Sequence, residues 1–302
     1  MKDEQYNNFS FVKDNLKRLE IVIVNYNSKI WVEKTLSSLY KYYIPYSKYN
    51  VIVTVVDNAS TDNSVEFIEK NYQKINLIKT SKNLGFSAGN NLALRKSTAD
   101  YIMLLNSDTE LTEKSKNIDI LIDMLKEDNK IGIVTPKLLL TNGKIDMACH
   151  RGEPSLLDCF FYFFGFEKFF SKIKFFTHYH LLHKDLNTIH EVDAVTGACI
   201  ITKLKCLKEI DLFDERYFMY SEDMDLCRKY REKGYKIIYN PYIEIIHHKY
   251  KSGLENKEIK QNTKKYFYDS LLLYYDKWYE EKFYYKILKP FLSLFIKFAT
   301  LK

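Results

Sequence analysis

The sequence predicts an α/β protein with a doubly wound, mostly parallel sheet and a helical extension at its C-terminal end. Between residues 20 and 135, short β-branched runs alternate with segments whose apolar residues recur at helical spacing. This alternation is typical of βαβ units, in which successive strands run parallel. The run from Tyr101 to Leu105 is almost wholly apolar, as expected of a strand that is covered on both faces.

The expected elements follow in order from the N-terminus. Runs rich in β-branched or apolar residues predict strands. They lie at residues 20–25, 51–56, 75–78, 101–105, 131–135, 191–202, 237–239 and 243–246. Helical spacing and helix start signals predict the helices. They lie at residues 29–43, from 62 or 63 onward, after a turn at 83–91 through 95, and at 112–127, 222–231 and 256–281.

The composition is that of a globular protein with a modest basic excess. The 302 residues carry a formal charge of +7, with 28% charged and 46% hydrophobic residues. This excess suits an anionic substrate or an anionic membrane surface and gives no indication of nucleic-acid binding. The five cysteines are scattered and form no Cys-x-x-Cys pair. That pattern favours reduced thiols in the cytosol over a zinc site or a disulfide scaffold.

Composition also divides the chain into three parts. Residues 1–18 are polar and lack the apolar core of a signal peptide. Residues 19–252 hold the expected sheet, with an aromatic-rich insertion at 156–190, and residues 253–302 form a helical extension. The insertion and the end of the extension mix aromatic residues with lysines, so neither suits a bilayer-spanning helix. Two alternatives remain for these segments: contact with lipid or acceptor, or simple coverage of the core.

Polar clusters follow three of the predicted strands. They include Asn25, Asn27, Asp57, Asn106 and Asp108. Because ligands of open α/β sheets bind at the carboxyl ends of the strands, we expect these clusters to converge on one crevice. A carboxylate there, such as Asp108, can hold a hard divalent cation and through it a diphosphate, although it could instead cap a following helix. The sequence contains neither Gly-x-Gly-x-x-Gly nor a Walker loop, which argues against a dehydrogenase or a nucleoside triphosphatase.

Six motifs stand in order along residues 19–252. They are Val24-Asn-Tyr-Asn27, Val55-Val-Asp-Asn-Ala-Ser-Thr-Asp62, Asn83-Leu-Gly-Phe-Ser-Ala-Gly-Asn90, Leu105-Asn-Ser-Asp108, Val195-Thr-Gly-Ala198 and Glu222-Asp-Met-Asp-Leu-Cys227. Together they resemble the inverting family-two glycosyltransferases of the GT-A fold, and most closely the rhamnosyltransferase-like branch. The resemblance implies a metal-dependent enzyme that uses a nucleotide-diphosphate sugar.

The resemblance also implies which residues bind the donor. Asn25 and Asn27 would border the nucleotide base, and Asp57 would accept the imide N–H of uracil or thymine. A second set would approach the ribose and the diphosphate. It comprises Asn83, Gly85 and Asn90. Three more residues complete the predicted substrate site. They are Asn106, which replaces the first Asp of the family's Asp-x-Asp motif, Gly197, which interrupts its strand, and Glu222.

The remaining implied roles are chemical. Asp223 matches the family's base, and Asp108 with His247 would bind a divalent Mn²⁺ or Mg²⁺ that bridges the phosphates. An inverting transfer needs one carboxylate to take the acceptor proton and a cation to neutralise the leaving diphosphate. There are plain alternatives: acidic first helical turns also occur for stability alone, and His247 with His248 could be a structural pair.

We therefore expect an inverting glycosyltransferase that acts in surface-polysaccharide assembly at the cytoplasmic face of the membrane. Its donor would be a dTDP- or UDP-sugar, with rhamnose as one candidate, and its acceptor a saccharide or a lipid-linked sugar. Two other classes stay open. A sugar-phosphate nucleotidyltransferase shares such a sheet but requires a Gly-rich, Arg-containing loop after the first strand, where the chain has Asn25-Tyr-Asn-Ser28. A catalytically silent nucleotide-sugar-binding module would keep the sheet without turnover.

Overall fold

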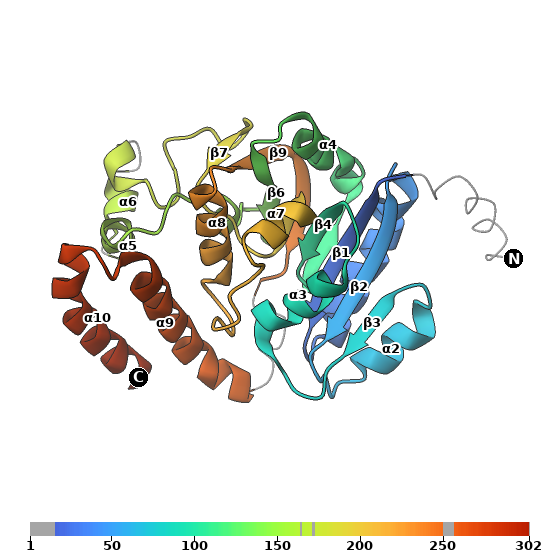
Figure 1. The fold of residues 1–302 in the computed structure, drawn as a ribbon, viewed down its shortest axis with the longest axis horizontal. Helices are drawn as coiled ribbons and strands as arrows, with labels where there is room; N and C mark the ends of the chain where they lie inside the picture. Colours follow the sequence, from blue (N-terminus) through green and yellow to red (C-terminus); the bar gives the residue numbers. More distant parts are fainter. Residues whose placement is uncertain (1–15, 164, 171–172, 250–256, 302) are drawn as a thin grey trace, which may run out of the picture.

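The computed structural model describes residues 16–163, 165–170, 173–249 and 257–301. Within them one sheet contains nine strands (Figure 1). The strands are β1 (Arg18–Asn25), β2 (Asn50–Asp57), β3 (Asn76–Lys79), β4 (Tyr101–Leu105), β5 (Thr109–Leu111), β6 (Ile131–Leu139), β7 (His190–Val192), β8 (Cys199–Lys203) and β9 (Lys236–His247).

The order of the strands is β3-β2-β1-β4-β8-β6-β9-β5, and β7 also pairs with β9. Strands β3, β2, β1 and β4 are parallel, and so are β6 and β9, whereas β8 runs antiparallel to both β4 and β6. The predicted α/β class with a doubly wound, mostly parallel sheet is confirmed. Since β1, β2 and β4 are parallel neighbours, their carboxyl ends lie at one edge of the sheet.

Helices and 3₁₀ turns connect the strands. The helices are α1 (Lys29–Tyr42), α2 (Ser64–Asn71), α3 (Gly85–Lys96), α4 (Asp119–Glu127), α5 (Leu156–Phe163), α6 (Phe166–Phe169), α7 (Leu204–Glu209), α8 (Glu222–Glu232), α9 (Lys257–Tyr279) and α10 (Phe283–Leu301). The 3₁₀ turns are η2 (Ile44–Tyr46), η3 (Glu113–Ser115), η4 (Met147–Cys149) and η5 (Lys174–Phe176).

The main apolar core lies around the central strands. All five residues of β4 are buried, as the apolar run predicts, and the side chains of β1, β8 and β9 pack into the same cluster. Burying one such Leu or Ile side chain stabilises the fold by about 1.5–3 kcal/mol. A second cluster joins α8 to the C-terminal helices. Its fully buried tyrosines are Tyr217, Tyr274, Tyr275 and Tyr285.

The predicted helix at 112–127 is partly wrong. The chain after Asp108 forms the short strand β5, which pairs with β9, then the turn η3, and α4 begins only at Asp119. Thr109 and Leu111 are buried against the sheet, and this burial outweighs the helical pattern. Consequently Asp108 does not cap a helix.

Two strand predictions also need correction. The run 191–202 is not one strand but two, β7 and β8, and Gly197 lies in the loop that connects them. Strand β7 pairs with β9, whereas β8 lies between β4 and β6. Conversely, 237–239 and 243–246 belong to the single strand β9. A register shift opposite Pro136 absorbs the interruption at Asn240 and Pro241.

The C-terminal helices lie at the end of the molecule away from β1, β2 and β3, close to α5, α6 and α8 (Figure 1). Their inner faces carry the second apolar cluster, to which Leu156 at the start of α5 and Leu292 of α10 also contribute. Among the described residues, no helix is both long enough and apolar enough to cross a membrane.

Candidate active site

The loops after β1 and β2 form one hydrogen-bonded unit. Asn25 Nδ2 donates to Asp57 Oδ2 at 2.8 Å, and Ser60 N donates to Asp57 Oδ1 at 2.8 Å. Ser60 Oγ accepts from Asn27 N, and Asn27 Oδ1 accepts from Thr61 N at 2.7 Å. Asn25 and Asp57 are buried, and Asn25 Oδ1 has no hydrogen-bond partner in the structure. Asp57 thus holds the two loops together through hydrogen bonds. Asn27 is more exposed than Asn25 and Asp57, the other two residues predicted to bind the nucleotide base.

The loop before α3 contacts the segment that leads into α8. Asn83 Oδ1 accepts from Gly85 N at 2.9 Å, and Phe86 N donates to the carbonyl oxygen of Phe218 at 2.8 Å. Gly85 has a φ of +82°, and a Cβ on it would lie 2.4 Å from the same carbonyl oxygen. Only glycine fits this approach. Asn90 donates from Nδ2 to the carbonyl oxygen of Phe86, so it holds the first turn of α3.

Asp223 is held at the start of α8 by groups from two other segments. Its Oδ2 accepts from Arg151 Nη2 at 3.0 Å and from Gly197 N at 3.3 Å, and its Oδ1 accepts from Met224 N at 2.7 Å. A Cβ on Gly197 would lie 3.1 Å from the ring of Phe86 and 4.0 Å from Asp223 Cβ. Asp223 therefore lies beside the loop before α3, and its carboxylate is held in place by the Arg151 guanidinium and two backbone N–H groups.

The two other carboxylates of this helical turn differ from Asp223. Glu222 is buried, its Oε2 has no hydrogen-bond partner, and burial next to the charge of Asp223 raises its pKa to about 8. Burial thus favours the protonated form of this side chain. Asp225 is buried and accepts hydrogen bonds from Lys277 Nζ and Trp278 Nε1 of α9, so its role is to anchor that helix.

Asp108 and His247 meet although 139 positions separate them in the sequence. Asp108 follows β4, His247 ends β9, and the pairing of β5 with β9 places His247 Nε2 3.5 Å from Asp108 Oδ1. His247 Nδ1 lies 2.9 Å from Asp146 Oδ2. Burial lowers the pKa of His247, but hydrogen bonds with the two carboxylates raise it to about 9. The pair of carboxylates therefore attracts positive charge to this point.

A backbone hydrogen bond joins the loop that carries Asp108 to the loop that carries Gly197. Asn106 N donates to the carbonyl oxygen of Ala198 at 3.0 Å, which links the Asp108 loop to the Gly197 loop beside Asp223. Asn106 Oδ1 is buried without a hydrogen-bond partner. His248 lies elsewhere: its Nε2 is 2.9 Å from Glu110 Oε2, and its ring packs on Trp31.

The sequence matches the model of a known family. The model of the family described as "Glycosyl transferase family 2" matches residues 20–176. The chain belongs to this family. The predicted family membership is thus confirmed, and the protein is a family 2 glycosyltransferase.

Its relatives agree on the fold. The glycosyltransferase is 26% identical over 242 residues to an N-acetylglucosaminyl-diphospho-decaprenol L-rhamnosyltransferase of Mycobacterium tuberculosis, with 76% of each chain covered. The mannosyltransferase PcManGT from Pyrobaculum calidifontis, solved with GDP-Man and Mn²⁺, aligns with a TM-score of 0.57 at 16% identity, covering 93% of this chain and 69% of that one. Staphylococcus aureus TarS 1-349, solved with UDP-GlcNAc, aligns with a TM-score of 0.53 at 18% sequence identity. The alignment covers 85% of this chain and 65% of that one. The GT-A-type fold is confirmed.

The residues present fit a partial metal site in this glycosyltransferase. Asp108 and His247 offer one carboxylate oxygen and one ring nitrogen at a buried point, and Asn106, in the same loop as Asp108, has a buried amide oxygen with no hydrogen-bond partner among the described residues. No group of three or more His, Cys, Asp or Glu side chains forms a metal cage among the described residues. Mg²⁺ and similar ions are often bound by one or two carboxylates, with substrate phosphates and water as the other ligands, so a cage is not required.

Two contact residues of the site were not predicted. Arg151 and Asp146 come from the segment between β6 and α5, which has no periodic pattern and belongs to none of the six motifs. A buried arginine or aspartate can be paired with a partner only once the fold is known. Residues 250–252, at the end of the predicted glycosyltransferase domain, lie outside the described residues.

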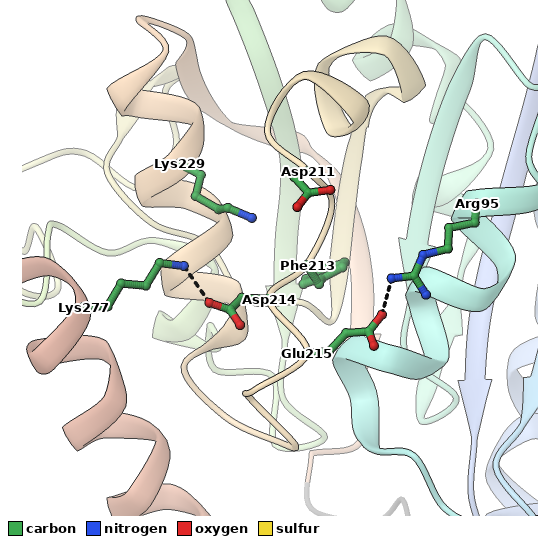
Figure 2. A pocket seen from close by; sticks show the side chains of 7 residues that line it. All are labelled: Arg95, Asp211, Phe213, Asp214, Glu215, Lys229 and Lys277. Atoms are coloured by element: carbon green, nitrogen blue, oxygen red, sulfur yellow. Dashed lines mark hydrogen bonds and ion pairs between the residues drawn. The ribbon is translucent and has the colours of Figure 1, made fainter.

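A pocket on this glycosyltransferase lies apart from the predicted site residues (Figure 2). Seven side chains line it. They are Arg95, Asp211, Phe213, Asp214, Glu215, Lys229 and Lys277. Figure 2 shows the ion pairs Arg95–Glu215 and Lys277–Asp214 across the gaps between α3, the loop before α8, and α9. Asp214 and Glu215 are thus already matched by cations that join these elements, and we do not assign the reaction to this pocket.

Proposed function

We propose that this glycosyltransferase inverts the anomeric centre as it moves a sugar from a nucleotide-diphosphate donor to a saccharide or lipid-linked acceptor. The observation that carries the proposal is the carboxylate of Asp223, held next to the loop before α3 and linked through the Gly197 and Asn106 loops to Asp108 and His247. Asp223 as the base, together with a cation bound by Asp108 and His247, would suit a displacement at the anomeric carbon of the donor sugar.

The step follows from this arrangement. An acceptor hydroxyl attacks the anomeric carbon, the bond from that carbon to the diphosphate oxygen breaks, and Asp223 takes the hydroxyl proton. One displacement inverts the centre, and no covalent intermediate with the protein is needed. Arg151 orients the Asp223 carboxylate through a contact of 3.0 Å.

A divalent cation, Mn²⁺ or Mg²⁺, completes the proposed site. Asp108 and His247 would hold it, with Asn106 beside them. When bound, it supplies positive charge that neutralises the leaving diphosphate. The Mn²⁺ of the mannosyltransferase neighbour supports this choice of cofactor.

The donor is proposed to be a dTDP- or UDP-sugar, with rhamnose as the first candidate. We propose that the nucleotide base binds at the hydrogen-bonded loops of Asn25 and Asp57, with Asn27 at their exposed side. Asn83, Gly85 and Asn90 would contact the ribose and the diphosphate. The M. tuberculosis relative, a rhamnosyltransferase by its name, supports the sugar and a lipid-diphosphate-linked acceptor in surface-polysaccharide assembly.

The proposed place of action is the cytoplasmic face of a membrane, at which a lipid-linked acceptor would be found. An apolar stripe on α10 supports peripheral contact: Phe283, Ile287 and Phe291 recur at a spacing of four residues and are 79%, 52% and 70% exposed. Phe169 of α6 and Phe175 of η5 are also exposed. Lys286 and Lys289 lie on the same helix, and such lysines are attracted to anionic lipid.

A thermal-shift screen of nucleotide sugars tests the proposed donor. The full chain is melted with dTDP-rhamnose, UDP-GlcNAc and GDP-mannose, each with and without Mn²⁺. At a donor concentration of about 100 Kd, binding adds about 2.7 kcal/mol to the stability of the fold. We expect the melting temperature to rise with a dTDP- or UDP-sugar, and more so with Mn²⁺. A rise in melting temperature only with GDP-mannose would contradict the proposed uracil or thymine base of the donor.

A second assay separates turnover from binding. Release of nucleoside diphosphate from the bound donor, in the presence of an acceptor, supports transfer. Release of pyrophosphate from a nucleoside triphosphate and a sugar phosphate would instead indicate a nucleotidyltransferase. Binding without either reaction, over the full acceptor panel, would indicate a silent binding module.

A further inference from the structure

The carboxylate of Asp146 contacts the ring nitrogen of His247 that points away from Asp108. His247 Nδ1 lies 2.9 Å from Asp146 Oδ2, and Nε2 lies 3.5 Å from Asp108 Oδ1. A hydrogen bond from Nδ1–H to Asp146 selects the neutral tautomer whose lone pair is on Nε2. Asp146 therefore turns a ligand nitrogen of the ring toward Asp108.

Asp146 is itself rigidly placed. It is 2% exposed, and its backbone N donates to the carbonyl oxygen of Leu138 at 2.8 Å. Its Oδ1 accepts from Ala148 N in the turn η4 and from Lys249 Nζ at 2.8 Å. With Oδ1 occupied by these two donors, Oδ2 is left for His247. The carboxylate thus has one oxygen for its own anchorage and one for the ring.

We propose that Asp146 is a positioning residue that holds His247 in the tautomer and orientation needed to bind the divalent cation. This inference rests on the proposed metal site. Histidine ligands of metal ions commonly donate their second N–H to a carboxylate, and removal of such a partner typically lowers metal affinity 10–100-fold. The neighbouring His248 cannot substitute, because it faces Glu110 and Trp31.

The experiment measures Mn²⁺ binding to the full chain by calorimetry in the presence of UDP, and does not depend on catalysis. Four proteins are compared: the natural chain, Asp146→Ala, His247→Ala and the double variant. Asp146→Ala should lower the Mn²⁺ affinity 10–100-fold, and the same substitution should cost nothing further in the His247→Ala background. Glu110→Gln is the matched control, because it removes the carboxylate partner of His248, and it should leave Mn²⁺ affinity unchanged.

Each result has a distinct meaning. Weakened binding in His247→Ala with natural affinity in Asp146→Ala overturns the positioning role and leaves the metal site standing. An equal loss from Asp146→Ala in both backgrounds also overturns it, since the effect would then come from the fold. Equal Mn²⁺ affinity in the natural chain and His247→Ala refutes the proposed metal site, and the positioning role with it. If Asp146→Ala does not fold, Asp146→Asn replaces it, with a smaller loss expected because the amide oxygen still accepts from Nδ1–H.

Discussion

The carboxylate of Asp223 depends on neighbours that share no local sequence with it. Arg151 approaches from the segment before the aromatic insertion and Gly197 from the loop before β8. We expect Asp223→Asn to lower the rate of sugar transfer about 10²–10⁴-fold, the usual contribution of a general base. Donor affinity should change little, because the lost group acts on the acceptor proton. Steady-state transfer rates and donor titration measure the two effects.

Glu222→Gln is the control for that prediction. Burial favours the protonated form of Glu222, and glutamine has the shape of that form, so transfer should persist. The folded-state pKa of about 8 exceeds the ordinary value of 4.5, so the unfolded chain loses its proton first and stability falls as pH rises from 4.5 to 8. Urea unfolding should therefore show a smaller loss between pH 5 and 8 in Glu222→Gln. Natural activity in Asp223→Asn together with an inactive Glu222→Gln would move the base to Glu222.

At the scale of elements, α9 anchors α8, the helix that carries Asp223, which we propose as the base. Lys277 Nζ pairs with Asp225 at 2.7 Å and with Asp214 at 2.8 Å, and Asp225 is 1% exposed. Loss of the lysine leaves a buried carboxylate without its cation, so Lys277→Met should lower the free energy of unfolding by about 3 kcal/mol. Chemical denaturation measures it. Lys286→Met is the control, because its pair with Glu281 is exposed and contributes at most about 1 kcal/mol. Equal stability of the two variants would contradict the anchoring role.

The elements also explain how far the sequence predicts this fold. Strands β1, β2 and β4 are long, β-branched or apolar, and buried, so local pattern and tertiary environment agree. β5 is only three residues long, and its pairing with β9 cannot be inferred from its own composition. Asn240 and Pro241 resemble a turn, yet the partner strand accommodates them through a register shift.

The candidate site shows the same division. The residues at the ends of parallel strands could be predicted together, because parallel strands deliver their carboxyl ends to one edge. His247 was assigned through a family pattern, and its approach to Asp108 depends on the unpredicted strand β5. Arg151 and Asp146 required the complete fold, because nothing in their local sequence indicates a buried partner.

At the scale of the whole molecule, the two sides of α10 differ. Tyr285 is fully buried in the second apolar cluster, whereas Phe283, Ile287 and Phe291 face outward. Figure 1 places α5 and α6 next to this helix, and Phe169 of α6 is also exposed. An isolated surface phenylalanine is ordinary, but a continuous stripe indicates an interaction surface.

We expect combined replacement of Phe283, Ile287 and Phe291 by Ser to lower binding to anionic lipid vesicles more than tenfold. Full burial of each side chain contributes about 1.5–3 kcal/mol, and a tenfold change corresponds to about 1.4 kcal/mol. Co-sedimentation with phosphatidylglycerol vesicles measures the bound fraction. The control variant replaces Ile120 and Tyr242, which are exposed on α4 and β9. Equal and negligible sedimentation of the natural chain and the triple variant would refute membrane contact.

The short stretch from Asp146 to Arg151 contacts both halves of the candidate site, since its first residue holds His247 and its last holds Asp223. One added or deleted residue between them would displace one of these contacts by up to about 3.8 Å, the spacing of consecutive Cα atoms. The interval of five positions that joins these two side chains therefore has to keep its length.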